Sequence, residues 1–291
     1  METIQLDKTG LQVGVIGFGA MQLSIQGRPE RAQALAVLHR ALDLGVTFID
    51  TADAYCLDET DKHHNEELIR EALATYPGPA EAVVVATKGG FMRPSGQWIR
   101  DSHPDHLRQA IRRSHEALGG ERPIPLWQHH APDPRLPVEV SLAVVKSAVE
   151  EGLIRYVGVS NYSVDEIRRA RRVIDIVSVQ NQYNPWHRQP ERDGVLAYCE
   201  REGLTFLPWS PFGGRGRAGR LGEIPALAAM AREKGRSPQQ LVLAWMRAKS
   251  PCILPIPGAS RLETLEDCLA AADLTLTPDE VARLDAAFDA L

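Results

Sequence analysis

The sequence predicts a (β/α)₈ barrel, an α/β fold, and three observations support this fold class. Short apolar runs alternate with longer amphipathic segments along nearly the whole chain of 291 residues. Strands that alternate with helices form parallel sheets, and eight of them favour closure of the sheet into a barrel. Reactive polar residues follow several of the apolar runs. Because no linker or low-complexity segment interrupts the pattern, we expect residues 1–291 to form one domain.

Eight apolar runs are the expected barrel strands. They are Val15–Phe18, Thr47–Asp50, Val83–Thr87, Leu126–His130, Tyr156–Val159, Ile176–Gln180, Thr205–Trp209 and Cys252–Ile256. Before them, Thr3–Leu6 and Leu11–Val13 flank the turn Lys8-Thr9-Gly10, which predicts a β-hairpin at the amino terminus.

Amphipathic segments between these runs are the expected helices. They include Arg31–Leu44, Glu66–Thr75, Pro104–Leu118, Val138–Glu151 and Glu191–Glu202, two helices between strands seven and eight (Glu223–Lys234 and Pro238–Lys249), and a closing helix, Pro278–Ala290. Helix starts are marked by capping-box spacing at Ser163/Glu166 and Ser260/Glu263, and by a cap before proline at Ser237-Pro238 and Thr277-Pro278.

Composition narrows the class of protein. The formal charge of −5 argues against a general binder of nucleic acid or anionic membranes. The four cysteines (Cys56, Cys199, Cys252 and Cys268) form no CxxC pair, which is typical of reduced thiols in the cytoplasm. The sequence has neither a signal peptide pattern nor an apolar run near the ~18 residues that span a membrane. We therefore expect a cytoplasmic protein without a membrane or nucleic-acid partner.

Residues capable of chemistry collect at the expected carboxyl ends of the strands, where such barrels hold their active sites. They are Asp50, Lys88, His130, Ser160, Asn161, Gln180, Trp209 and Ser210. Tyr55 follows Asp50 after a short loop. A nearby cation favours ionisation of a phenol and eases proton transfer, and Lys88 can supply that cation while Asp50 holds it. The residues alone leave a simpler interpretation open, in which Lys88 and Asp50 form a salt bridge at the rim and Tyr55 only packs.

Two apparent motifs carry no function. Gly17–Gln22 begins like a dinucleotide-binding GxGxxG loop, but Gln22 stands where the third glycine belongs. The pairs His63-His64 and His129-His130 lack the spacing of a zinc site, so we expect no metal.

Eight segments, taken in order, resemble the aldo-keto reductase superfamily. They are Gly17–Met21, Phe48–Tyr55, Ala86–Gly89, Leu126–Asp133, Tyr156–Asn161, Gln180–Pro185, Pro208–Pro211 and Ile256–Arg261. They extend from the first strand to the last part of the barrel, and the ordered set is far more specific than any one of them. Gly19–Leu23 and the Phe212–Gly214 turn are similar to bacterial members that include pyridoxal reductases.

The resemblance implies a reductase that transfers hydride from NADPH to a small aldehyde or ketone. Tyr55 would donate the proton, and Lys88 would favour ionisation of the Tyr55 phenol. Asp50 would pair with Lys88, and His130 would orient the carbonyl. Adjacent strand residues face opposite sides, and the family pattern places His130 inside and His129 outward, where leucine should be tolerated.

The resemblance also implies a set of cofactor-binding positions. Ser160, Asn161 and Gln180 match positions that hold the nicotinamide carboxamide, and Trp209 matches an aromatic residue that stacks on the nicotinamide. The remaining positions are Gly19, Ala20, Met21, Ser210, Pro211, Phe212, Gly213, Gly214, Arg220, Gly258, Ser260, Arg261, Thr264, Asp267 and Cys268.

Arg261 favours NADPH over NADH as the cofactor. It is expected in the first turn of a helix capped by Ser260, where an arginine can bind a phosphate in a forked arrangement. Arg215, Arg217 and Arg220 crowd the loop after strand seven, where they can reach the pyrophosphate.

Three departures from the family pattern stand out. The stretch Cys56–His64 lengthens the loop after Tyr55 and could narrow or cover the substrate pocket. Thr264 and Cys268 replace longer polar residues near the adenosine, and Trp209 replaces the usual tyrosine.

Two other functions stay open: a lyase that uses Lys88 as a Schiff-base nucleophile, and an accessory subunit that binds NADPH but turns over slowly.

Overall fold

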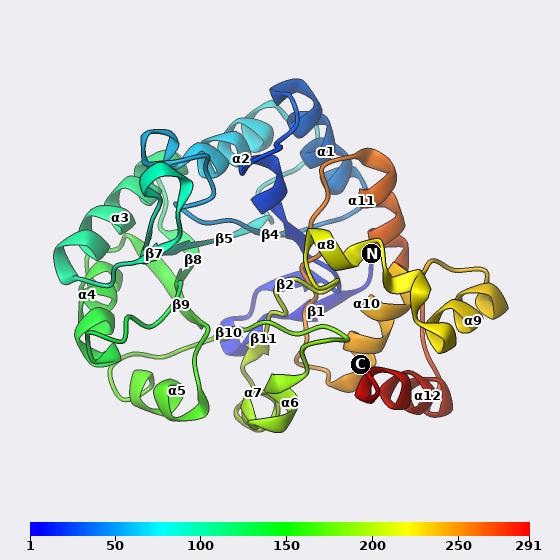
Figure 1. Cartoon of the computed structure of the whole chain (residues 1–291). Helices are drawn as coiled ribbons and strands as arrows, with labels where there is room; N and C mark the ends of the chain where they lie inside the picture. Colours follow the sequence, from blue (N-terminus) through cyan, green and yellow to red (C-terminus); the bar gives the residue numbers. More distant parts are fainter.

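The computed structural model describes the backbone of all 291 residues, and every side chain except that of Arg215. Its strands are β1 (Thr3–Gln5), β2 (Gln12–Gly14), β3 (Phe18–Gly19), β4 (Phe48–Asp50), β5 (Val84–Gly89), β6 (Phe91–Met92), β7 (Ile99–Arg100), β8 (Ile124–His129), β9 (Ile154–Ser160), β10 (Ser178–Gln180) and β11 (Thr205–Phe206). Seven of them form a parallel sheet in the order β11-β10-β9-β8-β5-β4-β3. Helices surround this sheet in Figure 1.

Residues 252–258 close the sheet into a barrel. Phe206 bridges to Ile253 on one side, and Gly19 bridges to Gly258 on the other. The amides of Gly17 and Gly19 donate to the carbonyls of Pro255 and Pro257, both at 2.9 Å. These prolines have no N–H to donate in return, so the eighth predicted strand, Cys252–Ile256, makes no regular ladder. The predicted (β/α)₈ barrel is confirmed, with a closing segment that is only partly hydrogen-bonded.

Several other strands are shorter than expected. The first barrel strand is Phe18–Gly19 instead of Val15–Phe18. The seventh ends at Phe206, because Pro208 interrupts the pairing before a last bridge between Gln182 and Trp209.

The helices are α1 (Arg31–Asp43), α2 (His64–Thr75), α3 (Pro104–Ala117), α4 (Val138–Glu150), α5 (Val164–Ala170), α6 (Gln189–Arg192), α7 (Val195–Glu202), α8 (Arg215–Ala218), α9 (Pro225–Lys234), α10 (Pro238–Lys249), α11 (Leu262–Leu269) and α12 (Pro278–Asp289). The expected helix Glu191–Glu202 is divided between α6 and α7 by Gly194, which has a φ of 80°. The caps at Ser163, Ser237 and Thr277 are confirmed. The cap at Ser260 is wrong, because α11 begins one residue later and Arg261 is its N-cap residue, without a side-chain cap.

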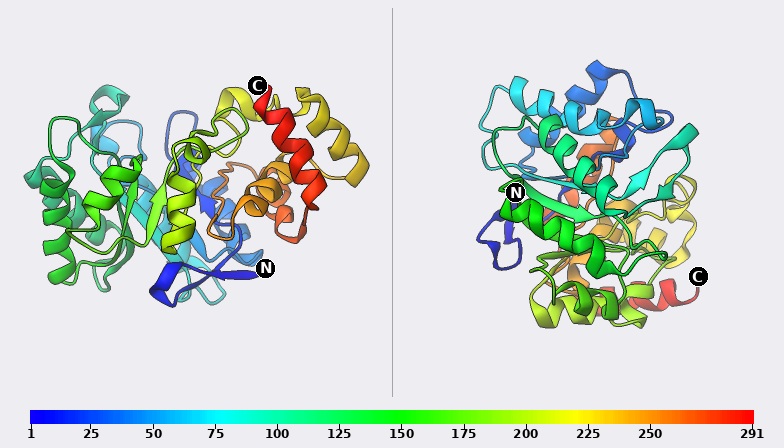
Figure 2. Two further views of the ribbon diagram at one scale, coloured as in Figure 1. Left: turned by 90° about the horizontal axis from the view of Figure 1, so that it is seen from below. Right: turned by 90° about the vertical axis from the view of Figure 1, so that its left-hand side faces the viewer.

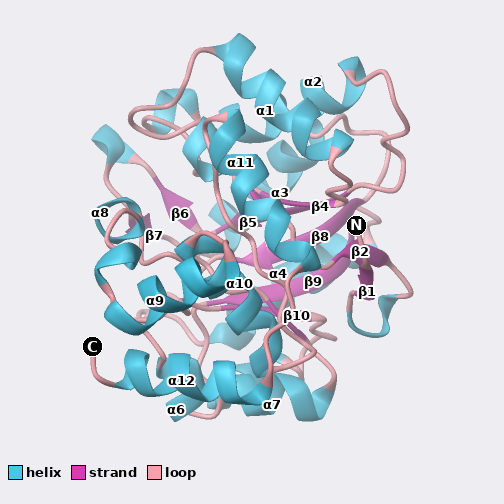
Figure 3. Cartoon of the chain, turned by 90° about the vertical axis from the view of Figure 1, so that its right-hand side faces the viewer, coloured by secondary structure: helices cyan, strands magenta, loops and turns pink.

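Two hairpins mark the two ends of the barrel (Figure 3). The predicted hairpin β1–β2 lies at the amino-terminal end, where Leu6 and Val13 pack with Phe48 and Leu254 in a buried cluster inside the barrel. The hairpin β6–β7, which the sequence did not predict, lies at the opposite end together with α8. Figure 2 shows β1–β2 standing apart from the carboxyl-terminal helix α12. Within the described residues, no helix has the length and apolar character needed to cross a membrane.

Candidate active site

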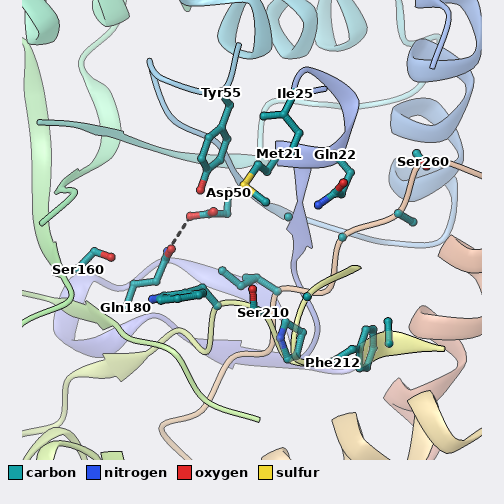
Figure 4. Close-up of a pocket in the computed structure, with 18 of the residues that line it drawn as sticks. Met21, Gln22, Ile25, Asp50, Tyr55, Ser160, Gln180, Ser210, Phe212 and Ser260 are labelled. Carbon is teal, nitrogen blue, oxygen red and sulfur yellow. Dashed lines mark hydrogen bonds between the residues drawn. The ribbon is translucent and has the colours of Figure 1, made fainter. Parts of the chain in front are cut away.

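A cavity of about 710 Å³ opens at the carboxyl ends of the strands. A volume of this size falls in the range of small-molecule and cofactor sites, about 300–1,000 Å³. Asp50, Tyr55 and His130 line it at one end, and Ser260, Arg261 and Thr264 line it at the other. Figure 4 shows Tyr55, Asp50 and Gln180 converging on the same space from three different strands or loops.

Lys88 lies at the base of the site and connects Tyr55 to Asp50. Its Nζ atom donates to Asp50 Oδ2 at 2.7 Å, to the carbonyl oxygen of Thr51 at 2.8 Å and to Tyr55 Oη at 2.9 Å. Three acceptors satisfy the three donors of an ammonium group. Lys88 is 0% exposed, so it acts on Tyr55 from beneath the cavity instead of lining it.

The protonation states follow from burial and charge. Burial raises the pKa of Tyr55, and the Lys88 ammonium opposes this rise by favouring the phenolate. Burial alone would lower the pKa of Lys88, but Asp50 and Tyr55 outweigh it, so the pKa of Lys88 is raised. At neutral pH the site therefore holds a protonated phenol beside a charged ammonium, which is the state that a proton donor needs.

Two glutamines hold the other oxygen of Asp50. Gln180 Nε2 donates to Asp50 Oδ1 at 2.8 Å, and Gln128 Nε2 donates to the same atom at 3.3 Å. The bond from Gln180 is drawn in Figure 4. Gln180 thus lines the cavity, as expected for a nicotinamide contact, but it also orients the carboxylate that holds Lys88. The role of Gln128 was not predicted, because glutamine in a strand carries no distinctive sequence signal.

His130 faces the cavity among aromatic rings. Its ring centroid lies 5.9 Å from that of Tyr55 and 4.7 Å from that of Phe91. Burial, Lys88 and His129 together lower the pKa of His130 well below its ordinary value, so the imidazole is neutral. Its buried Nδ1 atom has no hydrogen-bond partner among the described residues.

His129 points the other way, as the strand alternation predicts, and its environment is polar. Its Nδ1 atom lies 2.6 Å from Tyr162 Oη, and its Nε2 atom lies 2.8 Å from Ser102 Oγ. Burial lowers the pKa of His129 from 6.5 to about 4. The expectation that leucine would be neutral for stability at this position is therefore revised.

We expect His129→Leu to keep its activity and to lose stability at pH 7. The variant leaves the buried Tyr162 hydroxyl without its partner, which costs about 1–3 kcal/mol. Wild type should lose stability as the pH falls from about 6.5 towards 4, because the unfolded histidine binds a proton there and the native one does not. Unfolding in urea at pH 7 and pH 5 should show a smaller pH effect in the variant. The double variant His129→Leu/Tyr162→Phe removes both polar partners and should recover part of the loss; no recovery would contradict this explanation.

Trp209 and Asn161 are tied together beside the cavity. Trp209 Nε1 donates to Asn161 Oδ1 at 3.1 Å, while Asn161 Nδ2 donates to the carbonyl oxygen of His130 at 3.0 Å and to Ser160 Oγ at 3.1 Å. Asn161 holds a left-handed conformation, with a φ of 63°. The Asn161 side chain thus holds the Trp209 indole, and its Oδ1 atom keeps a second lone pair that could accept from a ligand amide.

The predicted cofactor positions are divided between the cavity and its surroundings. Those that line it are Gly19, Met21, Ser160, Asn161, Gln180, Trp209, Ser210, Pro211, Phe212, Gly214, Gly258, Ser260, Arg261 and Thr264. Ala20, Gly213, Arg220, Asp267 and Cys268 are outside its lining. Asp267 accepts from Ser237 and Gln240 of the α10 start, Arg220 pairs with Glu223 at the surface, and Cys268 is buried. Of the three loop arginines, Arg217 lies over the Trp186 ring, and the Arg215 side chain lies outside the described residues.

The cavity also has walls that the sequence did not predict. Phe91 and Trp98 from the hairpin β6–β7, together with Gln22 and Ile25, line it. The long loop 56–64 contributes no residue to the lining. Its Glu59 and Leu57 instead accept hydrogen bonds from Arg93, which lies between β6 and β7. The strands β6 and β7 have two residues each, too few for a periodicity from which to predict the hairpin.

The aldo/keto reductase family model matches residues 15–289. The chain therefore belongs to this family, and it is an NAD(P)H-dependent oxidoreductase. Among the described residues no cluster of side chains could hold a metal ion.

Curated relatives and solved structures agree with this assignment. The chain is 38% identical over 278 residues to an uncharacterized oxidoreductase of Schizosaccharomyces pombe, covering 94% of this chain and 86% of that protein. It is 32% identical over 283 residues to pyridoxine 4-dehydrogenase of Escherichia coli, covering 94% of each. A thermostable aldo-keto reductase in complex with the inhibitor epalrestat aligns with a TM-score of 0.83 at 28% identity, over 99% of this chain and all of that one. An aldo/keto reductase from Klebsiella pneumoniae in complex with NADP and acetate aligns with a TM-score of 0.81 at 26% identity, over 99% and 96% of the chains.

Proposed function

We propose that this protein reduces a small aldehyde or ketone to an alcohol with NADPH, and that Tyr55 donates the proton. The observation that carries the proposal is the contact of the Lys88 ammonium with both Tyr55 Oη and the Asp50 carboxylate at the base of the cavity. The whole chain, residues 1–291, would act as one domain, since the first and last parts of the barrel both line the cavity.

The chain's own residues suit a proton transfer to a carbonyl oxygen. A bound nicotinamide cofactor would supply the hydride. Tyr55 would give its phenolic proton to the oxygen as negative charge develops there, and Lys88 would stabilise the phenolate that remains. The neutral His130 would donate a hydrogen bond to the same oxygen and hold the carbonyl in line.

The residues along the cavity fit a dinucleotide. Ser160 and Gln180 place polar groups at the substrate end, and the Trp209 indole offers a flat apolar surface. At the other end Arg261 is exposed, and its guanidinium donates to Thr264 Oγ1 at 3.5 Å. Among the described residues no carboxylate forms an ion pair with Arg261, which leaves its guanidinium available for a phosphate.

Preference for NADPH over NADH would come from Arg261, and the NADP bound to the Klebsiella pneumoniae relative is consistent with this. We expect Arg261→Ala to weaken NADPH binding by about ten- to a hundredfold, because a charge-assisted hydrogen bond contributes roughly 1.5–3 kcal/mol. NADH binding should hardly change. Titration calorimetry with both cofactors measures the difference. Arg112→Ala, which removes a surface arginine paired with Glu151 outside the cavity lining, is the matched control. An equal loss for NADPH and NADH in Arg261→Ala would rule out recognition of the 2′-phosphate.

A panel of carbonyl compounds assayed with NADPH and with NADH tests the proposed function. The panel should contain pyridoxal, because a relative is a pyridoxine 4-dehydrogenase, and also methylglyoxal, aromatic aldehydes and sugar ketones. Oxidation of NADPH that depends on one of these compounds supports the proposal. Tight NADPH binding without turnover of any compound would instead favour the accessory-subunit alternative.

The lyase alternative is disfavoured by the state of Lys88. A Schiff-base lysine must lose its proton to attack a carbonyl, whereas this lysine is fully buried, donates to three acceptors and has a raised pKa.

A further inference from the structure

Four aromatic side chains form a wall at the substrate end of the cavity. The Trp98 ring centroid lies 5.7 Å from that of Phe91 and 6.4 Å from that of His130, and Tyr55 completes the group at 6.3 Å. All of these rings meet nearly edge to face. The charged residue that lines this end is Asp50, and Lys88 neutralises it at 2.7 Å. The wall therefore suits a flat aromatic ring, and by itself it gives no preference for the charge of the ligand.

A buried arginine lies directly behind this wall. The Arg93 guanidinium carbon lies 3.8 Å from the centroid of the Trp98 ring, and Arg93 is 1% exposed. Its terminal nitrogens donate to the carbonyl oxygens of Ala54 and Leu57 and to Gln26 Oε1, each at 3.4 Å. These are long bonds to neutral acceptors, and Nε has no partner among the described residues.

The positive charge of Arg93 is only partly compensated, because its neighbouring carboxylates lie beyond ion-pair distance of the guanidinium. The carboxylates of Asp58 and Glu59 attract this guanidinium, and Glu59 accepts from the Arg93 backbone amide at 2.5 Å, but among the described residues no carboxylate forms an ion pair with the guanidinium itself. Burial lowers the pKa of Arg93, but guanidinium groups stay protonated in proteins. A buried charge is screened weakly, so its field reaches the neighbouring cavity.

Trp98 lies between the Arg93 charge and the substrate end of the cavity. Trp98 is 44% exposed, and Arg93 covers one face of its ring. The exposed surface of Trp98 therefore belongs to the opposite face and the edges of its ring. A ligand in contact with that face would be separated from the Arg93 guanidinium by the thickness of the ring. The negative face of the Trp98 ring would ordinarily attract a cation. Across this ring, however, the Arg93 charge repels a second cation and attracts an anion.

We propose that the site prefers an aromatic aldehyde that carries a negative charge, and that Arg93 sets this preference from behind Trp98. The inference rests on the proposed reductase function for its turnover readout only. Leu57, within the lengthened loop 56–64, is one of the acceptors that hold Arg93. The longer loop would thus act on specificity without entering the cavity.

A charge series of ligands with the same ring tests this proposal. Binding of benzoate and of phenyltrimethylammonium, neither of which can be reduced, is measured by titration calorimetry on the NADP⁺-saturated protein. Turnover is measured with 4-formylbenzoate, benzaldehyde and 4-(trimethylammonio)benzaldehyde. In kcat/KM we expect the anion to be favoured over benzaldehyde by about tenfold and the cation to be disfavoured by a similar factor. In binding, benzoate should therefore be favoured over phenyltrimethylammonium by about a hundredfold.

Substitution of Arg93 separates its charge from its packing. Arg93→Met keeps most of the apolar stem and should bring the anion-to-cation ratio close to one, with benzaldehyde turnover largely unchanged. Arg93→Gln keeps an amide donor for the Leu57 and Ala54 carbonyls, and it should give the same loss of preference if Arg93→Met does not fold. Arg112→Met removes a surface arginine paired with Glu151 and should change neither ratio.

Two outcomes would overturn the inference: equal binding of benzoate and phenyltrimethylammonium to the wild type, or an unchanged ratio in a folded Arg93 variant. Failure of the proposed reductase function looks different. In that case no aldehyde is reduced by the wild type, while benzoate still binds more tightly than phenyltrimethylammonium and the difference disappears in Arg93→Met or Arg93→Gln.

Discussion

Replacing Tyr55 by phenylalanine should lower carbonyl turnover by about 10²–10⁴-fold, which is the usual contribution of a general acid. The ring keeps its packing against His130 and Trp98, while the hydroxyl beside Lys88 is lost. NADPH binding should be nearly intact. Steady-state kinetics with the best substrate of the carbonyl panel, together with a cofactor titration, measure both quantities.

The matched control is Tyr76→Phe, the same chemical change at a partly buried residue outside the cavity, whose hydroxyl donates to Asp43. It should leave turnover unchanged. A Tyr55→Phe protein that turns over at close to the wild-type rate would show that another group protonates the carbonyl oxygen.

Replacing Lys88 by methionine should damage both folding stability and activity. The Asp50 carboxylate would stay buried with amide donors alone, and breaking a buried ion pair costs roughly 3–5 kcal/mol. A nearby cation lowers an acid's pKa by about 1–3 units, so its loss should slow proton transfer from Tyr55 by about 10- to 10³-fold. Urea unfolding and turnover, measured on the same preparation, give the two effects.

The double variant Asp50→Asn/Lys88→Met separates these effects. Removing both charges eliminates the unpaired carboxylate, so much of the lost stability should return, but activity should stay low because the cation beside Tyr55 is still absent. A single variant Lys88→Met as stable as the wild type would contradict the buried ion pair as described.

The sequence predicted the parts of this structure that have strong local signals. The strand-end residues Asp50, Lys88 and His130 were placed from apolar runs and the known geometry of parallel barrels. Their contacts at the base of the cavity follow from that placement. The orientation of His129 away from the cavity followed from strand alternation, but its hydrogen bonds to Tyr162 and Ser102 did not, because these partners are 33 and 27 residues away.

What the sequence missed depends on contacts between distant segments. The hairpin β6–β7 has two residues in each strand, too few for any periodicity. Arg93 appeared as an ordinary loop arginine, and only the fold brings it against Trp98 and beneath the loop 56–64. The resemblance implied a cofactor role for Asp267, but it gave no indication of the hydrogen bonds to Ser237 and Gln240 by which this residue also joins two helices. The position of a residue in a family pattern does not reveal which groups its side chain hydrogen-bonds.

The way in which the barrel closes limits which residues can change together. Pro255 and Pro257 accept hydrogen bonds but donate none, so closure on that side depends on the amides of Gly17 and Gly19. A side chain at Gly17 would come within 2.9 Å of Phe48, and one at Gly19 within 2.8 Å of the Ile256 carbonyl oxygen. Alanine at position 17 would therefore require Phe48 of β4 to move, and alanine at position 19 would require the closing segment to move. The two prolines require only a backbone amide at positions 17 and 19, so it is the lack of space for a side chain that restricts these two positions of the first strand to glycine.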